Sequence, residues 1–159
     1  MEKIVNRLAW LADNAVVIVF ILMIIIAFFQ VFFRYVLNNP LFGSEEIARL
    51  FAVWLTFLGA SIAVKRGGHI SVDILYLRVS SRNQKIFRFA SDVFLLIFNL
   101  ILLVEGTRLA YLSHAFESSA LRFPMSIVFS ALPISAFIIL IFLIQSIRQD
   151  ILQLMGRSG

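Results

Sequence analysis

The sequence predicts an all-α integral membrane protein, with four transmembrane helices in one domain that spans residues 1–159. Hydrophobic residues make up 61% of the chain and charged residues only 14%, whereas soluble domains contain about 45–50% and about 25% of these classes. The mean hydropathy is correspondingly high, at +0.96. A water-soluble core of this size has no room for so much apolar surface, whereas a lipid bilayer accommodates it. The charged residues also cluster at the ends of four long apolar runs, as they do in membrane proteins.

Four apolar runs are long enough to cross a membrane as helices. About 20 helical residues span a hydrocarbon core of about 30 Å, and the qualifying runs cover residues 14–35, 46–64, 90–111 and 125–147. Each run is apolar on nearly every side, which favours helices over barrel strands because a helix satisfies its own backbone hydrogen bonds in lipid. The first run is longer than the core of a signal peptide (about 7–15 residues), and no small-x-small cleavage site follows it. We therefore expect a retained anchor.

Turn and cap residues mark the connection between the first two helices. Asn38 opens an Asn-Asn-Pro turn signal that stops the first helix. Ser44 then suits the N-cap of the second helix, and the Glu45-Glu46 pair suits the positive end of its dipole.

The connection between the second and third helices is the longest one. Ile70, Ile74 and Leu77 recur at helical spacing, which predicts a short amphipathic helix over residues 69–80 at the membrane surface. The alternation of Ile70, Val72 and Ile74 also permits an extended strand.

Acidic residues within the predicted helices have a base one helical turn away. The pairs are Glu45 with Arg49, Arg88 with Asp92, and Glu105 with Arg108, while Asn99 lies near mid-span on nearly the same face as Asp92. Such pairs orient helices near a membrane surface, whereas a proton or ion relay needs an unpaired carboxylate at depth. The pattern therefore favours a structural role and argues against an autonomous pump.

The second predicted helix carries a stripe of small residues. Ala52, Thr56 and Ala60 follow small-xxx-small spacing, and Gly59 repeats it with a further alanine. Such a stripe lets helix backbones approach closely, either within the four-helix unit or against another subunit, and both alternatives stay open. Trp54, near mid-span, is expected to pack against protein with its indole N–H bonded to a partner.

Pro133 lies well inside the fourth predicted helix. Proline removes one backbone hydrogen bond and usually kinks a helix. Ser126, Ser130 and Ser135 are placed to cover the freed carbonyls. We expect a kink that serves packing rather than a moving hinge.

Lysine and arginine are distributed unequally between the two sides of the predicted spans. With the N-terminus cytoplasmic, the inner set is Lys3, Arg7, Lys65, Arg66, Arg78, Arg82, Lys85, Arg88, Arg148 and Arg157, and the outer set is Arg34, Arg49, Arg108 and Arg122. Because cytoplasmic loops carry the excess of these residues, we expect both termini inside.

The composition also excludes several classes of function. The chain has no cysteine, which excludes a disulfide framework, a thiolate metal site and a cysteine nucleophile. His69 and His114 stand far apart, without ligand spacing. The net charge of +5 resides at helix ends rather than in a basic patch, so we expect membrane lipids and no nucleic acid as partners. No nucleophile, base or metal set assembles, which argues against an enzyme.

The segment from Gln30 to Asp73 combines charged and turn residues at fixed offsets. Its distinctive positions are Arg34-Tyr35, Asn38, Glu45-Glu46, Arg49, Val53-Trp54, Phe57, Gly59, His69-Ile70 and Val72-Asp73. In these features the chain resembles the small membrane subunit of TRAP transporters, the DctQ-like family. The second half is similar more loosely, through Ala120-Leu121, Pro124 and Leu132-Pro133-Ile134. One departure is Gly43, beside Phe42, where family members often carry a tryptophan.

The resemblance implies an accessory subunit in the bacterial inner membrane. In that family a large membrane subunit holds the substrate and sodium sites, a periplasmic binding protein delivers an organic acid such as sialic acid or a C4-dicarboxylate, and the small subunit braces the scaffold. This chain is then expected to need no cofactor of its own, with sodium bound in the large partner. We expect Glu45, Glu46, Arg49, Trp54, Thr56, Gly59 and Ala60 to contact the large subunit, and Arg34, Asn38, Asn39, Glu117 and Arg122 to contact the binding protein.

A stand-alone small four-helix transporter is the alternative. Exporters of that kind rely on a membrane-embedded carboxylate, typically in the first helix, where this chain offers Gln30. The sequence therefore favours the accessory subunit.

Overall fold

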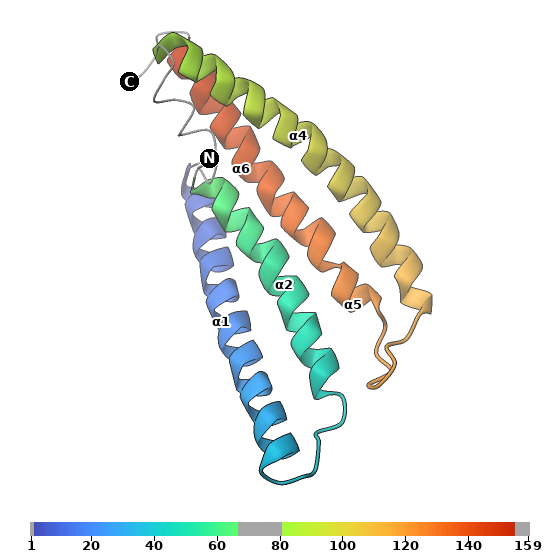
Figure 1. Cartoon of the computed structure of the whole chain (residues 1–159). Helices are drawn as coiled ribbons and strands as arrows, with labels where there is room; N and C mark the ends of the chain where they lie inside the picture. Colours follow the sequence, from blue (N-terminus) through green and yellow to red (C-terminus); the bar gives the residue numbers. More distant parts are fainter. Residues whose placement is uncertain (1, 67–80, 155–159) are drawn as a thin grey trace.

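The computed structural model describes residues 2–66 and 81–154, which form long helices joined by short connections (Figure 1). The elements in chain order are α1 Glu2–Tyr35, α2 Ser44–Lys65, α4 Ser81–Leu112, the 3-10 turn η1 Ser113–Ala115, α5 Ser126–Phe129 and α6 Ala131–Leu154. Four helical spans, of which α5 and α6 together form the last, are long and apolar enough to cross a membrane. The predicted all-α membrane fold is thus confirmed. The predicted surface helix at 69–80 lies outside the described residues.

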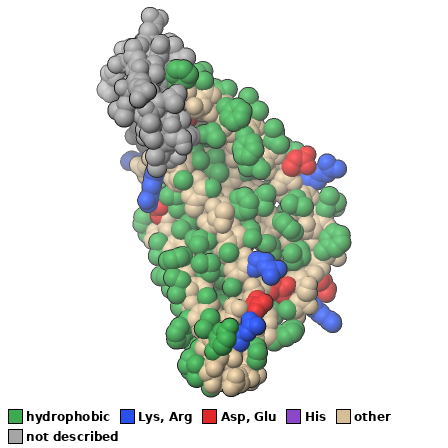
Figure 2. Space-filling view, in the orientation of Figure 1, with side chains coloured by type: hydrophobic (Ala, Val, Ile, Leu, Met, Phe, Trp, Pro, Cys, Tyr) green, Lys and Arg blue, Asp and Glu red, His purple; other side chains and the backbone are tan. Residues whose placement is uncertain are grey.

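The four long helices stand side by side in one row, in the order α1, α2, α6, α4 (Figure 1). A row has two broad sides, and most of the exposed large hydrophobic side chains belong to α1, α4 and α6. No residue in the most apolar 18-residue stretch of α1 is buried, and Figure 2 shows a largely hydrophobic surface between the charged residues. Because lipid is as apolar as these side chains, a bilayer accommodates both sides of the row.

α1 begins at Glu2, well before the predicted start at residue 14, and packing gives the reason. Val5 and Ala9 are 5% and 1% exposed and pack with Phe142 of α6. Contact with another helix stabilises turns that hydropathy alone does not indicate. α4 likewise begins at Ser81 rather than at residue 90, whereas α2 lies within two residues of its predicted bounds.

Pro133 lies three residues after an interruption of the last span at Ser130, across which Ile134 N still donates to Ser130 O at 3.2 Å. α5 ends and α6 begins on either side of that serine, so Pro133 occupies the first turn of α6, where a backbone N–H has no helical acceptor. The predicted kink stays a prediction, and the interruption lies beside the carbonyl group of residue 129, which proline leaves without a helical donor. Ser130 bridges the break, since its Oγ donates to Ile127 O at 2.8 Å. Ser135, in contrast, is fully buried, and its hydroxyl covers no carbonyl in the described part of the chain.

α4 and α6 approach closely around Gly106 and Asn99. A Cβ added to Gly106 would lie 3.0 Å from Leu132 Cβ and 3.5 Å from Pro133 Cδ, so glycine lets the two helices come together. Asn99 is 3% exposed and donates from Nδ2 to Ala136 O at 2.9 Å. A side-chain hydrogen bond between helices stabilises their association in an apolar medium. These two contacts hold α4 beside α6.

Candidate functional site

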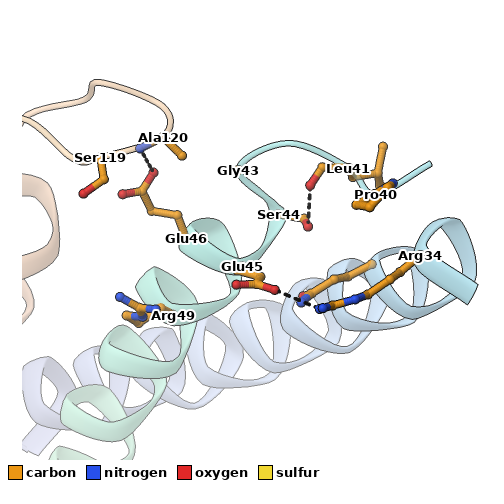
Figure 3. Close-up of a pocket in the computed structure, with 11 residues that line it drawn as sticks. Arg34, Pro40, Leu41, Gly43, Ser44, Glu45, Glu46, Arg49, Ser119 and Ala120 are labelled. Atoms are coloured by element: carbon orange, nitrogen blue, oxygen red, sulfur yellow. Dashed lines mark hydrogen bonds and ion pairs between the residues drawn. The ribbon is translucent and has the colours of Figure 1, made fainter. Parts of the chain in front are cut away.

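The charged residues of the first two predicted spans gather at one end of the row, opposite the described chain ends (Figure 1). We call it the loop end, because it carries the α1–α2 connection (36–43) and the segment between α4 and α5 (113–125). A cavity of about 380 Å³ opens there (Figure 3). Its lining residues are Gln30, Arg34, Pro40, Leu41, Gly43, Ser44, Glu45, Glu46, Arg49, Ser119 and Ala120.

Glu46 ties the first turn of α2 to the 113–125 segment. Its Oε2 accepts hydrogen bonds from the backbone N–H groups of Ala120, at 3.1 Å, and Leu121, at 2.9 Å. Hydrogen bonds to an ionised carboxylate are about twice as strong as neutral ones. The segment is folded back on itself, since Ser118 N donates to Phe123 O at 2.9 Å. We call the two bonds to Glu46 the Glu46 clasp.

Gly43 forms the N-cap of α2 and lies against Leu121. Its φ of 75° is left-handed, which costs a non-glycine residue about 1–2 kcal/mol, and a Cβ would lie 2.6 Å from Leu121 Cδ2. α2 therefore begins one residue after Gly43, at Ser44, whose Oγ donates back to Leu41 O at 2.9 Å. The prediction that Ser44 is the N-cap is wrong for this reason. The same packing explains why this chain has glycine at position 43.

Glu45 pairs with Arg34 across the α1–α2 connection, at 3.3 Å between Oε1 and Nη1. The predicted pair of Glu45 with Arg49 is wrong, because the connection brings the end of α1 within reach of this carboxylate. Both side chains of the observed pair are more than half exposed, so it contributes about 0–1 kcal/mol to stability. Arg49 borders the cavity and has no ion-pair partner in the described part of the chain.

The structure describes both side chains of only one of the two other predicted ion pairs. Arg108 lies 3.8 Å from Glu105, as predicted, whereas the side chain of Arg88 lies outside the described set. Within the described residues there is no group of three or more His, Asp or Glu side chains placed to hold a metal ion. The Nδ1 atom of His114 lies 3.4 Å from the hydroxyl oxygen of Ser126.

The small residues of α2 lie on an exposed side of the helix. Exposed positions recur every three or four residues and form what we call the α2 stripe: Glu45, Arg49, Ala52, Thr56, Ala60 and Ala63. A Cβ added to Gly59, beside the stripe, would meet no atom within 4 Å. The stripe is therefore not used for packing among the described helices.

Trp54 is partly buried and does not belong to the exposed α2 stripe. Its indole Nε1 donates to Ile127 O at 3.1 Å, which is the kind of partner that the sequence led us to expect. This bond connects α2 to α5, at the start of the last span and just before the break at Ser130.

The five residues predicted to contact a binding protein are all exposed at the loop end: Arg34, Asn38, Asn39, Glu117 and Arg122. Asn38 and Arg122 have positive φ angles of 48° and 54°, so each forms a tight turn, as the Asn-Asn-Pro signal predicts for the first. Sequence reasoning missed Ala120 and Leu121 as partners of Glu46, because the backbone N–H groups that they supply are common to all residues except proline.

Known proteins match most of the chain. Residues 23–153 match the family model described as "Tripartite ATP-independent periplasmic transporters, DctQ component". A putative TRAP transporter small permease protein of Haemophilus influenzae (strain ATCC 51907 / DSM 11121 / KW20 / Rd) is 37% identical over 86 residues, which cover 54% of this chain and 53% of that protein. The C4-dicarboxylate TRAP transporter small permease protein DctQ of Vibrio cholerae is 35% identical over 83 residues, which cover 52% of this chain and 35% of that protein.

A third relative is much longer than this chain. SiaT, the sialic acid TRAP transporter permease protein of Haemophilus influenzae (strain 86-028NP), is 31% identical over 148 residues, which cover 91% of this chain but 23% of SiaT. The chain thus spans about half the length of the first small permease and less than a quarter of SiaT. Because the family model covers residues 23–153 of 159, the chain belongs to the family of DctQ components of tripartite ATP-independent periplasmic transporters.

Proposed function

We propose that this chain is a small, non-catalytic membrane subunit that braces the large transport subunit of a TRAP transporter. The observation that carries the proposal is the match to SiaT, in which a segment similar to 91% of this chain occupies 23% of one longer permease protein. The isethionate TRAP transporter permease protein DctMQ of Oleidesulfovibrio alaskensis matches over 17% of its own length. A segment that occurs inside a longer permease is expected, as a separate chain, to bind the remainder of such a permease.

The α2 stripe, with Gly59 beside it, is the surface that we propose for the large subunit. Small side chains let two helix backbones approach closely within a membrane, and the charged end of the stripe adds polar contacts. Glu46 and Trp54 contribute indirectly, because their hydrogen bonds within the chain hold α2 in its place.

The loop end is the surface that we propose for a periplasmic binding protein that delivers an organic acid. The names of SiaT and of the Vibrio cholerae protein refer to sialic acid and to C4-dicarboxylates, which supports a carboxylate substrate and leaves the choice between them open. We assign the substrate and sodium sites to the large subunit, so this chain is expected to need no cofactor.

We further propose that the chain lies in the bacterial inner membrane with both termini in the cytoplasm. α1 starts and α6 ends at the same end of the row (Figure 1), and most lysines and arginines belong to the loops and termini on that side. A green fluorescent protein fused after Gly159 is expected to fluoresce, because it folds in the cytoplasm, and alkaline phosphatase at the same position is expected to be inactive. The opposite pair of results would contradict this orientation.

Purification and reconstitution test the accessory role. When the tagged chain is produced together with its large subunit, the large subunit is expected to co-purify with it. Liposomes that contain both subunits are expected to take up a radiolabelled carboxylate when the binding protein and an inward sodium gradient are present. Liposomes that contain this chain alone are expected to show no uptake above empty liposomes.

Two outcomes would change the proposal in different ways. Uptake by the chain alone would contradict the accessory role and support a stand-alone four-helix transporter. Uptake by both subunits that does not respond to the sodium gradient would contradict sodium coupling and leave the accessory role intact.

A further inference from the structure

The cavity at the loop end contains charge that the contacts within the chain do not use. Two arginines and two glutamates line it, so its formal charge is zero. Glu46 is engaged by two backbone N–H groups, and Arg34 pairs with Glu45. Arg49 is exposed and has no ion-pair or hydrogen-bond partner for its guanidinium among the described residues. The cavity thus presents a free guanidinium near two carboxylates (Figure 3).

The cavity lies where the surface of the bilayer is expected. Tyr35, the last residue of α1, and Tyr111, the residue before the end of α4, are 72% and 81% exposed at this end of the row. Exposed tyrosines favour the level of the lipid headgroups. Phe28 and Val31, on the last turns of α1, are exposed and belong to its apolar run. A molecule in the cavity therefore meets charged groups together with the apolar lining residues Pro40, Leu41 and Ala120, and the exposed apolar surface of α1 begins at the same end of the row.

We propose that the cavity binds a zwitterionic phospholipid with a primary ammonium, such as phosphatidylethanolamine. The guanidinium of Arg49 holds the phosphate, since planar guanidinium groups suit phosphate oxygens. The ammonium lies against the carboxylate of Glu45, and the acyl chains follow the exposed apolar side chains of α1. All lining residues belong to this chain, so lipid binding by the purified chain does not rest on the proposed function. Glu45 and Arg49 are also the charged end of the α2 stripe, so in a complete transporter the lipid would border the large subunit.

The charge of the cavity decides which lipid fits. A headgroup that carries both charges leaves a neutral cavity neutral, whereas an anionic headgroup places an uncompensated negative charge beside Glu45 and Glu46. A free phosphate ion would use Arg49 but would leave the apolar side chains of α1 in contact with other lipids. The geometry therefore favours a whole zwitterionic lipid over either competitor.

Native mass spectrometry of the purified full-length chain tests this proposal. The chain is mixed with equal amounts of phosphatidylethanolamine and phosphatidylglycerol that have the same acyl chains, and one bound phosphatidylethanolamine is expected to be retained in preference. Arg49→Gln is expected to lower its retention about tenfold, the effect of losing one hydrogen bond between charged groups. Arg108→Gln is the matched control, because Arg108 lies on α4 near the loop end but does not line the cavity. The Arg108→Gln variant is expected to retain the lipid.

Several results would overturn the proposal. Equal retention of the two lipids by the unaltered chain would do so without any variant, so the test does not depend on the folding of Arg49→Gln. Undiminished lipid retention by Arg49→Gln would also overturn the proposal. If Arg108→Gln lost as much lipid as Arg49→Gln, the result would indicate a general attraction of lipids to arginines and would overturn it too. Displacement of the lipid by an equal concentration of free phosphoethanolamine would contradict the role assigned to the acyl chains.

Discussion

Replacing Gly106 by leucine is expected to push α4 away from α6 and to lower the free energy of unfolding by about 1–3 kcal/mol, the usual cost of overpacking. A Cβ alone would already lie 3.0 Å from Leu132 Cβ, and the rest of a leucine side chain has no space between the helices. Separation would also break the hydrogen bond from Asn99 to Ala136 O and leave a buried amide unsatisfied. Unfolding of the purified chain by SDS, followed by tryptophan fluorescence and circular dichroism, measures the change.

Gly59→Leu is the matched control for this prediction. The exchange is the same, but a Cβ on Gly59 meets no atom within 4 Å, and leucine has a better helix propensity than glycine by about 0.8 kcal/mol. The free energy of unfolding is therefore expected to stay the same or to rise slightly. In the complete transporter, this variant is expected to reduce co-purification of the large subunit, because it fills the surface beside the α2 stripe. An equal loss of stability in both glycine variants would contradict the tight contact at Gly106.

Glu46→Ala is expected to release the 113–125 segment while the long helices stay in place. The variant removes the acceptor of the backbone N–H groups of Ala120 and Leu121. Because hydrogen bonds to a charged group are among the stronger ones, exchange of these two amides with solvent is expected to become about tenfold faster or more. Hydrogen exchange followed by mass spectrometry, with fragmentation that resolves single residues, measures this effect.

Glu45→Ala is the control for the Glu46 clasp. Glu45 is the preceding residue on α2, is more exposed, and contacts Arg34 rather than the 113–125 segment. Its removal is expected to leave exchange at Ala120 and Leu121 unchanged. Slow exchange at both amides in Glu46→Ala would show that the segment is held by its own hairpin bonds and not by the clasp. Glu46→Gln, which keeps an acceptor oxygen but loses the charge, is expected to give an intermediate rate.

The membrane fold was predictable because hydropathy is a local property, readable over about 20 consecutive residues. The ends of the helices depend instead on contacts between distant parts of the chain. Val5 and Ala9 extend α1 because they meet Phe142 of α6, and nothing in the first residues of the sequence indicates this partner. The break at Ser130 was missed for a related reason, since proline is compatible both with a kink and with the first turn of a new helix.

The candidate site was predictable in its residues and less so in their contacts. Charge and position placed Glu45 and Glu46 at the start of the second helix, as the structure has them. Which arginine pairs with Glu45 depends on the path of the α1–α2 connection, and that path depends on left-handed turns at Asn38 and Gly43. The partners of Glu46 are backbone groups, which carry no mark in the sequence. Which side of α2 stays exposed, and so forms the α2 stripe, likewise depends on where the neighbouring helices lie.

The row of helices has a consequence for the path of a solute. Four helices that stand abreast form a wall, not a tube, and a wall supplies one side of an aqueous route at most. Any passage across the bilayer next to this chain would therefore have to be completed by a second polypeptide. In the role that we propose, a wall of this kind would give the large subunit a fixed edge that spans the whole thickness of the membrane.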